Sequence, residues 1–415
     1  MSDRMTESSH GLPHGTTAAL TASDVQPPAD LAQPRSRALV IGLGATAAAA
    51  VGGFLNPDQF FKSYLLGYLF MLGIAAGCLA LCLLHHMSRG AWGLMLRRVW
   101  EAAIKTLPFV ALLFIPIVLG RTHLYSWMVP GAMSDPILKE KEVYLNLPFF
   151  LARAALYFAV WMGLGFGLVR LSKKQDETGD PTLFRKMQVI AGPGVVLYCL
   201  TATFAAFDWL MGIDAKWFSS IFGLIFIVGQ GLSALAFCTL VIAFLGAREP
   251  MRSFIRPANL HDYGKLTMAF TMIWAYFSFS QMLIIWSGNL PEEVGFFVDR
   301  IGPWKPVSIA LAVLHFFLPF VLLLSRDIKR SSTTLSRVAI LMLIASWLDL
   351  YWYIAPTLHP ASVLPHWLDL VLPVALVGLW SWLFFGYLAK RPLLPINDPF
   401  LPEALARETA HEPAH

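Results

Sequence analysis

The stretch LIFIVGQGLSALAFCTLVIAFL, residues 224–245, decides the fold class. Nearly every residue in it is apolar or small, and the apolar residues follow one another without alternating with polar ones. A membrane-spanning β-strand needs about ten alternating residues, whereas a membrane-spanning helix needs about 20 successive apolar ones. The stretch therefore predicts a transmembrane helix.

The rest of the chain has the same character. The chain has 415 residues, of which 57% are hydrophobic and 14% charged, whereas soluble domains carry about 25% charged residues. So much apolar surface requires lipid as the solvent, and helices satisfy their backbone groups there. About ten runs are long enough to span a bilayer, which predicts an all-α membrane protein. The runs begin near Arg37, Lys62, Leu96, Asn146, Met187, Trp217, Asp262, Lys305, Leu335 and His366.

The two ends of the chain differ from this hydrophobic part. Residues 1–36 are polar and rich in Pro, Ser and Thr, and they lack the apolar run of a signal peptide. They are predicted to form a disordered cytoplasmic tail. A ten-helix transmembrane domain is expected at residues 37–390, followed by a proline-rich cytoplasmic tail at residues 391–415.

The distribution of Lys and Arg predicts the orientation in the membrane. With ten spans, both termini lie on one side, and the loops expected on that side hold most of the loop lysines and arginines. Cytoplasmic loops carry such an excess, so both termini are predicted to be cytoplasmic. The net charge of +5 follows from this bias and gives no reason to expect a nucleic-acid partner.

Motifs for cofactors are missing from the sequence. A membrane haem held by two histidines needs two of them in mid-span, and only His315 is so placed. There is no phosphate-binding loop, HExxH or CxxCH motif. The cysteines lie inside spans without a CxxC pair and are interpreted as small buried residues: Cys78, Cys82, Cys199 and Cys238. The chain is therefore expected to hold no haem, cluster, nucleotide or metal ion and to have no catalytic residue of its own.

Several charged residues are expected near the outer membrane boundary. Asp208 comes at the outer end of one span, and Asp214 lies in the tight turn that follows it. Arg153 is expected just below the outer surface and Asp349 in the outer half of its span. Charges within spans face the interior or water and usually pair, so these four residues are expected to converge on one outer cavity. The alternative is that Arg153 only neutralises an aspartate as a packing contact.

A second set of ionisable residues lies deeper and further inward. Glu101 and Lys105 are four residues apart, which favours an ion pair within one helix, and His315 is near mid-membrane. Because ionisable residues inside membranes often mark proton routes, the candidates for a proton pathway are Asp208, Asp214, Asp349, His315, Glu101 and Lys105. Alternatively, the helical pair has no transport role and the histidine is a hydrogen-bonded core residue.

Small residues spaced four apart favour close packing of helices in a membrane. Gly73 with Gly77 and Gly163 with Gly167 have this spacing. Close helix contacts are therefore expected at both pairs.

Several longer segments together carry a resemblance to a known family. They include FFKSYLLGYLF, FDWLMGIDAKWFSSIFG, the segment ending in NLPEE, HFFLPFVLLLSRDIKR and WLDLYWYIAPTLHP. Across residues 37–390 the chain resembles the NrfD-like, or polysulfide-reductase-type, integral membrane proteins. It is most similar to those of the bacterial alternative complex III, a quinol:cytochrome c oxidoreductase that contains two such paralogues. Of the two, it looks more like the one to which a proton route, rather than quinol oxidation, is assigned.

The resemblance implies a fold and a place in electron transport. Eight of the helices would form two four-helix bundles, in the inner membrane of a bacterium. The complex would oxidise quinol and pass electrons to cytochrome c or to a terminal oxidase. Its partners would be the NrfD-like paralogue, a multihaem cytochrome c and iron–sulfur proteins, which would hold the haem c and the clusters. This chain would offer a proton pathway and carry no redox cofactor.

Three other functions stay open at this point. The chain could bind quinol itself, which requires a cavity near Arg153, Asp208 and Asp349 wide enough for a quinone ring, with a proton acceptor in reach. It could be a structural scaffold for the redox subunits. A stand-alone transporter would show discontinuous helices in corresponding positions of two halves, and no such pair is seen in the sequence.

Overall fold

A computed structural model of the chain describes residues 20–405, apart from residues 361 and 403. Within this part the secondary structure is helical and no strand occurs. Ten helical segments there are long and apolar enough to cross a membrane, so the predicted fold class is confirmed. These segments are α1 (Ala32–Leu55), α2 (Pro57–Ser88), α3 (Arg97–Ile104) with α4 (Leu107–Leu112) and α5 (Ile115–Leu119), α8 (Leu147–Thr178), α9 (Thr182–Trp209), α10 (Phe222–Gly246), α11 (Pro257–Gly288), α13 (Lys305–Leu311) with η8 (Ala312–Phe317) and α14 (Leu318–Leu324), α16 (Ser332–Leu358), and α17 (Trp367–Leu388).

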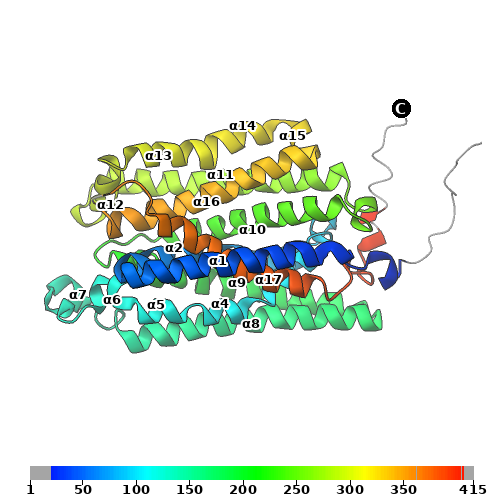
Figure 1. Ribbon diagram of the computed structural model, residues 1–415, viewed down its shortest axis with the longest axis horizontal. Helices are drawn as coiled ribbons and strands as arrows, with labels where there is room; N and C mark the ends of the chain where they lie inside the picture. The colour runs from blue at the N-terminus through cyan, green and yellow to red at the C-terminus, as the bar shows by residue number, and fades with distance from the viewer. Residues whose placement is uncertain (1–19, 361, 403, 406–415) are drawn as a thin grey trace, which may run out of the picture.

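The spanning helices lie side by side along the long axis of the molecule (Figure 1). We call one end of the bundle the terminal face, because residues 20–31 and 389–402 both lie there. The other end, the loop face, carries three short helices: α6 (Arg121–Leu124), α7 (Pro136–Glu140) and α12 (Pro291–Ile301). The chain thus enters and leaves the bundle on the same side.

Eight of the spanning segments pack in two groups of four. The first group consists of α2, α3–α5, α8 and α9, and the second of α10, α11, α13–α14 and α16. Contacts between α2 and α10 join the groups, while α17 packs on α2 and α1 covers α17. This arrangement agrees with the two four-helix bundles expected from the resemblance.

Prolines interrupt two of the spans. Pro108 and Pro116 stand at the starts of α4 and α5, so the third span is broken into short helices. Proline lacks an N–H and clashes with the carbonyl four residues earlier. In the eighth span, Pro319 follows His315 at this distance, and the helix widens to a π-helical turn at Ala312–Phe317. Such widened turns often occur at functional sites.

Residues 20–36 differ from the expected disordered tail. Helical turns begin at Ala22 and α1 begins at Ala32. This segment is ordered because Val25 is fully buried and its carbonyl accepts a hydrogen bond from the Leu393 N–H at 2.8 Å. Asp30 also forms an ion pair with Arg248. The prediction for residues 20–36 was therefore wrong, and residues 1–19 lie outside the described residues.

Of the two glycine pairs predicted to pack closely against another helix, only Gly73 with Gly77 does so in the described structure. A Cβ atom on Gly77 would overlap the carbonyl oxygen of Gln230, so α2 and α10 approach closely here. A Cβ atom on Gly163 or Gly167 would meet nothing within 4 Å. The expectation for the second pair was wrong because Gly163 is exposed, on a face of α8 without a helix neighbour at this position. Spacing alone does not say which face of a helix is turned inward.

Replacing Gly77 with alanine is expected to lower the free energy of unfolding by about 1–3 kcal/mol, the usual cost of overpacking. The matched control is Gly163→Ala, where helix propensity favours alanine by about 0.5–1 kcal/mol. Thermal unfolding of the two variants in the same detergent checks this prediction. Equal unfolding temperatures for the two variants would contradict the close contact between α2 and α10.

Candidate functional site

Arg153 on α8 and Asp208 on α9 form a buried ion pair. The Arg153 Nε and Nη2 atoms donate to the two Asp208 carboxylate oxygens at 2.8 and 2.7 Å, and the Tyr157 hydroxyl donates to Oδ2 at 2.7 Å. The guanidinium also lies 3.8 Å from the centre of the Tyr144 ring. Both oxygens of Asp208 are therefore held in a fixed geometry, which suits a packing contact between two helices better than repeated loss and gain of a proton.

Asp349 on α16 has a different environment. Its side chain is buried, with 6% of the residue exposed, and it lies about 14 Å from the loop-face end of α16 by helical rise. Its Oδ2 atom accepts a hydrogen bond from the Trp274 Nε1 at 3.3 Å, and its Oδ1 atom has no partner in the described part of the chain. None of the ion pairs found there includes Asp349.

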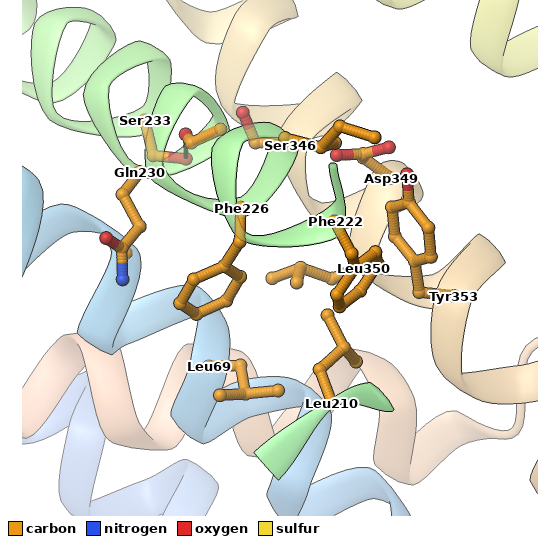
Figure 2. Close-up of a pocket in the computed structure, with 13 residues that line it drawn as sticks. Leu69, Leu210, Phe222, Phe226, Gln230, Ser233, Ser346, Asp349, Leu350 and Tyr353 are labelled. Atoms are coloured by element: carbon orange, nitrogen blue, oxygen red, sulfur yellow. Dashed lines mark hydrogen bonds between the residues drawn. The ribbon is translucent and has the colours of Figure 1, made fainter. Parts of the chain in front are cut away.

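A small cavity with several polar groups in its wall lies next to Asp349 between α2, α10 and α16 (Figure 2). Its volume is about 30 Å³, and Gln230, Ser233 and Ser346 line it together with apolar side chains. The Gln230 Nε2 and Ser346 Oγ atoms, like Asp349 Oδ1, are buried without a protein partner among the described residues. A water molecule needs about 10–15 Å³ and two to four polar partners. The cavity is therefore large enough for about two waters.

His315 packs against Trp274, the residue that donates the hydrogen bond to Asp349. The two rings meet edge to face, with their centres 4.1 Å apart, while the indole N–H points to the Asp349 carboxylate. His315 is fully buried within the widened turn before Pro319. Helices α11 and α16 and the turn η8 thus bring two of the predicted residues, His315 and Asp349, into contact with one tryptophan.

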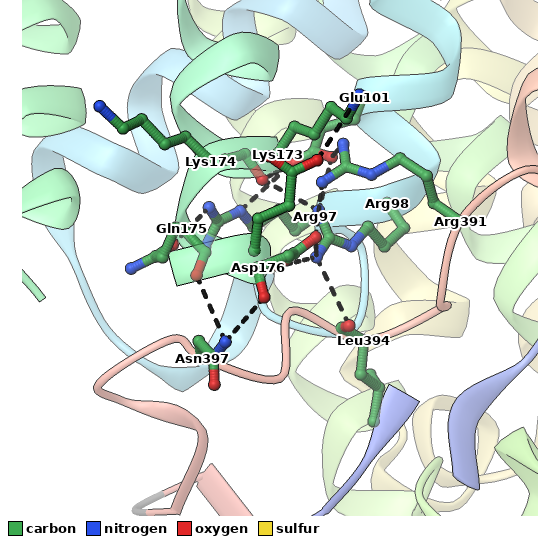
Figure 3. A network of polar contacts seen from close by, with 12 residues as sticks. Arg97, Arg98, Glu101, Lys173, Lys174, Gln175, Asp176, Arg391, Leu394 and Asn397 are labelled. Atoms are coloured by element: carbon green, nitrogen blue, oxygen red, sulfur yellow. Dashed lines mark hydrogen bonds and ion pairs between the residues drawn. The ribbon is translucent and has the colours of Figure 1, made fainter. Parts of the chain in front are cut away.

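Glu101 on α3 is the centre of a polar network near the terminal face (Figure 3). Its carboxylate accepts hydrogen bonds from Arg97 at 3.2 Å, Arg98 at 2.7 Å and Arg391 at 2.7 Å. The Ser172 hydroxyl donates a further hydrogen bond at 2.5 Å. Both carboxylate oxygens therefore have several partners, and the charge of Glu101 is balanced by arginine.

The predicted pair of Glu101 with Lys105 does not form. No ion pair among the described residues joins the two, and the Lys105 ammonium lies 5.9 Å from the centre of the Tyr387 ring instead. The reason is local: Lys105 caps the end of α3, and arginines already occupy both oxygens of Glu101. The planar guanidinium donates several N–H groups to a carboxylate, whereas the lysine ammonium is a single point charge.

The segment that follows α17, residues 389–402, is fixed to the terminal face by this network. Arg391 also bonds to Asp176 on α8 at 2.6 Å, and Asp398 forms an ion pair with Arg97. Leu393 and Leu394 of this segment are buried. This strap closes the terminal face over the ends of α3 and α8.

Replacing Arg391 with glutamine is expected to loosen the strap. The side chain is only 14% exposed and bonds to two carboxylates, so we expect a loss of about 1–2 kcal/mol, between the values for surface and buried ion pairs. Proteinase K digestion followed by mass spectrometry checks this, with faster cleavage expected within residues 389–402. The control is Lys173→Gln, which removes an exposed pair with Glu177. Identical cleavage in both variants would contradict a fixed strap.

The expected convergence of outer charges is not observed. Asp214 lies in the turn on the loop face, where it accepts a hydrogen bond from the Lys216 N–H at 3.3 Å. No hydrogen bond or ion pair among the described residues joins it to Asp208 or Asp349, and the cavity beside Asp349 is lined by neither Arg153 nor Asp208. The predicted residues therefore fall into separate groups: the pair near the loop face, Asp349 with Trp274 and His315, and the network around Glu101.

Neither a metal site nor a relative resolves the function further. Within the described residues, no group of three or more His, Cys, Asp or Glu side chains could hold a metal ion. No protein-family model matches the chain, and no curated protein is detectably similar to it.

Three residues of the Asp349 site were missed in the sequence. Gln230 is the amide in the apolar stretch at residues 224–245, and its position inside a span was a usable signal because buried polar groups need partners. Ser346 and Trp274 gave no such signal, since serine and tryptophan are ordinary in packed membrane helices. Only the tertiary structure shows that they surround a carboxyl group.

Proposed function

We propose that this chain is a membrane component of a quinol-oxidising respiratory complex and that Asp349 exchanges protons within it. The observation that supports this proposal is a buried carboxyl group that has no cationic partner among the described residues and lies beside a small cavity with polar groups in its wall. An ionisable residue inside a membrane is costly, and such residues are usually retained for function.

The environment of Asp349 suits proton exchange better than that of Asp208. Among the described residues, the Asp349 carboxyl group accepts a hydrogen bond from the Trp274 N–H and forms no ion pair, so it can gain or lose a proton without breaking one. Waters in the cavity would connect the Oδ1 atom of Asp349 to Gln230, which also lines the cavity. The Gln230 side-chain oxygen accepts a hydrogen bond from the Tyr198 hydroxyl at 2.7 Å, which extends the polar groups to α9. His315, packed against Trp274, is the nearest further candidate.

The resemblance to the NrfD-like membrane proteins supports the rest of the proposal. Quinol oxidation and the haem c and iron–sulfur cofactors then belong to partner subunits, and electrons pass to cytochrome c or an oxidase. The excess of Lys and Arg on one side supports a cytoplasmic terminal face in a bacterial inner membrane. The redox subunits would then dock on the loop face.

Purification of the chain from native membranes in a mild detergent tests this assignment. We expect a multihaem cytochrome c and an iron–sulfur protein to accompany it, seen by mass spectrometry and by haem bands in the visible spectrum. A chain that remains monomeric and colourless after chemical cross-linking in the membrane would contradict the assignment and favour a transporter.

Quinol binding beside Asp349 is not supported by the size of the cavity. Pockets for small organic ligands are about 300–1,000 Å³, ten times or more the 30 Å³ found here. A scaffold remains the second candidate, favoured by the fully paired Arg153 and Asp208 and by the network around Glu101. Loss of proton translocation on neutralising Asp349, without loss of assembly, would separate the relay from the scaffold.

A further inference from the structure

A large apolar groove lies on the second group of helices, at the side away from α2. Its volume is about 1110 Å³, and its walls are α11 on one side and α13 with η8 on the other. Helix α12 closes it at the loop face. Aromatic and aliphatic side chains form most of its lining, among them Tyr276, Phe279, Met282, Trp286, Phe297 and Phe317. Tyr276 and Trp286 are largely exposed, so the groove opens to the lipid-facing surface.

The groove has the depth of one membrane leaflet. It begins at α12 on the loop face and ends at Met272 on α11 and at Phe317 on η8, both near the middle of their spans. From Lys305 to Phe317 the wall measures about 18 Å by helical rise, close to half of a hydrocarbon core of about 30 Å. A transmembrane helix of a partner would need a wall that continues to the other face. An acyl chain of one leaflet needs no more than this length.

A buried positive charge lies at the loop-face end of the groove. Arg300 on α12 is 2% exposed and donates hydrogen bonds to the carbonyl oxygens of Phe296, Trp352 and Tyr353. No ion pair among the described residues includes it, and burial lowers the pKa of its guanidinium to about 9. The guanidinium has five N–H donors, so two remain after these three bonds. Asp299 and Asp214 are close enough to favour its charge, yet neither is ion-paired with it.

Lys305 adds a second cation at the same end. It begins α13, lines the groove and is exposed. The groove therefore combines an apolar trough one leaflet deep with two cations at the height of the lipid headgroups. Clustered cations at this height attract anionic lipids, by about fivefold in affinity for each Lys or Arg.

We propose that this groove binds an anionic phospholipid, with its phosphate at Arg300 and Lys305 and an acyl chain along α11 and α13. The charge selects this occupant over a quinone, which carries no anionic group, and the groove's depth selects it over a transmembrane helix. The proposal does not depend on proton exchange at Asp349. Its failure would leave that function untouched.

Native mass spectrometry of the full-length chain tests the proposal. The detergent-purified chain is mixed with equal amounts of phosphatidylglycerol and phosphatidylethanolamine that carry the same acyl chains. We expect preferential binding of phosphatidylglycerol, reduced about fivefold by Lys305→Gln. Lys139→Gln on α7, an exposed cation of the same face, is the matched control and should change nothing.

Two further variants separate the headgroup from the acyl chain. Ala275→Phe fills the groove wall and should reduce the binding of both lipids. Arg300→Gln should abolish the preference for phosphatidylglycerol. Arg300 also donates hydrogen bonds to three carbonyl oxygens, so this variant can fail to fold. In that case Lys305→Gln and Ala275→Phe decide the test.

Several outcomes would overturn the proposal. Equal binding of the two lipids by the wild-type chain, unchanged by Lys305→Gln, would mean unspecific surrounding lipid. A quinone that co-purifies, is displaced by Ala275→Phe and ignores Lys305→Gln would make quinone the occupant. Cross-links from Ile309 to a transmembrane helix of another protein in the native complex would assign the groove to a protein partner.

Discussion

Replacement of Asp349 with asparagine is expected to reduce proton translocation by about tenfold or more while the chain still folds and assembles. Asparagine has the same shape and can still accept the hydrogen bond from Trp274, but it cannot carry a proton to or from the cavity. Removing a group that donates and accepts protons commonly costs a factor of about 10²–10⁴ in rate. A route through other residues would make the loss smaller.

The measurement is the number of protons moved per electron by the intact complex in sealed vesicles. Asp349→Glu should retain part of the activity because it keeps a carboxyl group, and Glu140→Gln, an exposed carboxyl on α7, is the matched control. Thermal unfolding of each variant shows that the fold is kept. An unchanged stoichiometry in Asp349→Asn would remove Asp349 from the pathway.

Replacement of Arg153 with glutamine is expected to lower the free energy of unfolding by about 3–5 kcal/mol. This is the usual cost when one partner of a buried ion pair is removed and the other charge stays buried. Of the side-chain hydrogen bonds that the described residues make to the Asp208 carboxylate, the one from Tyr157 would be left. The cation also covers the rings of Tyr144 and Phe149, and this contact would be lost as well.

A double-mutant cycle on the pair gives the measurement. The double variant Arg153→Gln/Asp208→Asn is expected to be more stable in detergent than Arg153→Gln alone, because it leaves no buried charge. Lys216→Gln, which removes an exposed pair with Asp135, should cost no more than about 1 kcal/mol. Strictly additive effects of the two substitutions would contradict a coupled pair.

The sequence was sufficient to predict the spans and how far along each span the charged residues lie. It did not show toward which neighbouring helices these residues point. Apolar runs of membrane length leave the chain few alternatives, so the ten spanning segments follow from composition. Arg153 and Asp208 pair because α8 and α9 are neighbours in the chain and both residues lie near the loop face. Asp349 also lies in the loop-face half of its span but belongs to the other group of helices, and depth alone could not show this.

Contacts between distant segments were the other source of error. Glu101 contacts Arg391 because the strap folds back over the terminal face. The spacing of residues within α3 cannot predict this contact. The order of residues 20–36 has a similar origin, since Val25 bonds to Leu393 of the strap. Polar segments that look disordered by composition can be ordered by such partners, and the sequence of either segment alone does not show the other.

Proton exchange at Asp349 is tested most directly by infrared difference spectroscopy of the complex during quinol oxidation. We expect a carboxyl C=O band that changes on turnover, shifts when H₂O is replaced by D₂O, and disappears in Asp349→Asn. A responding carboxyl band that persists in Asp349→Asn, or the lack of any such band in the wild-type complex, would contradict proton exchange at this residue.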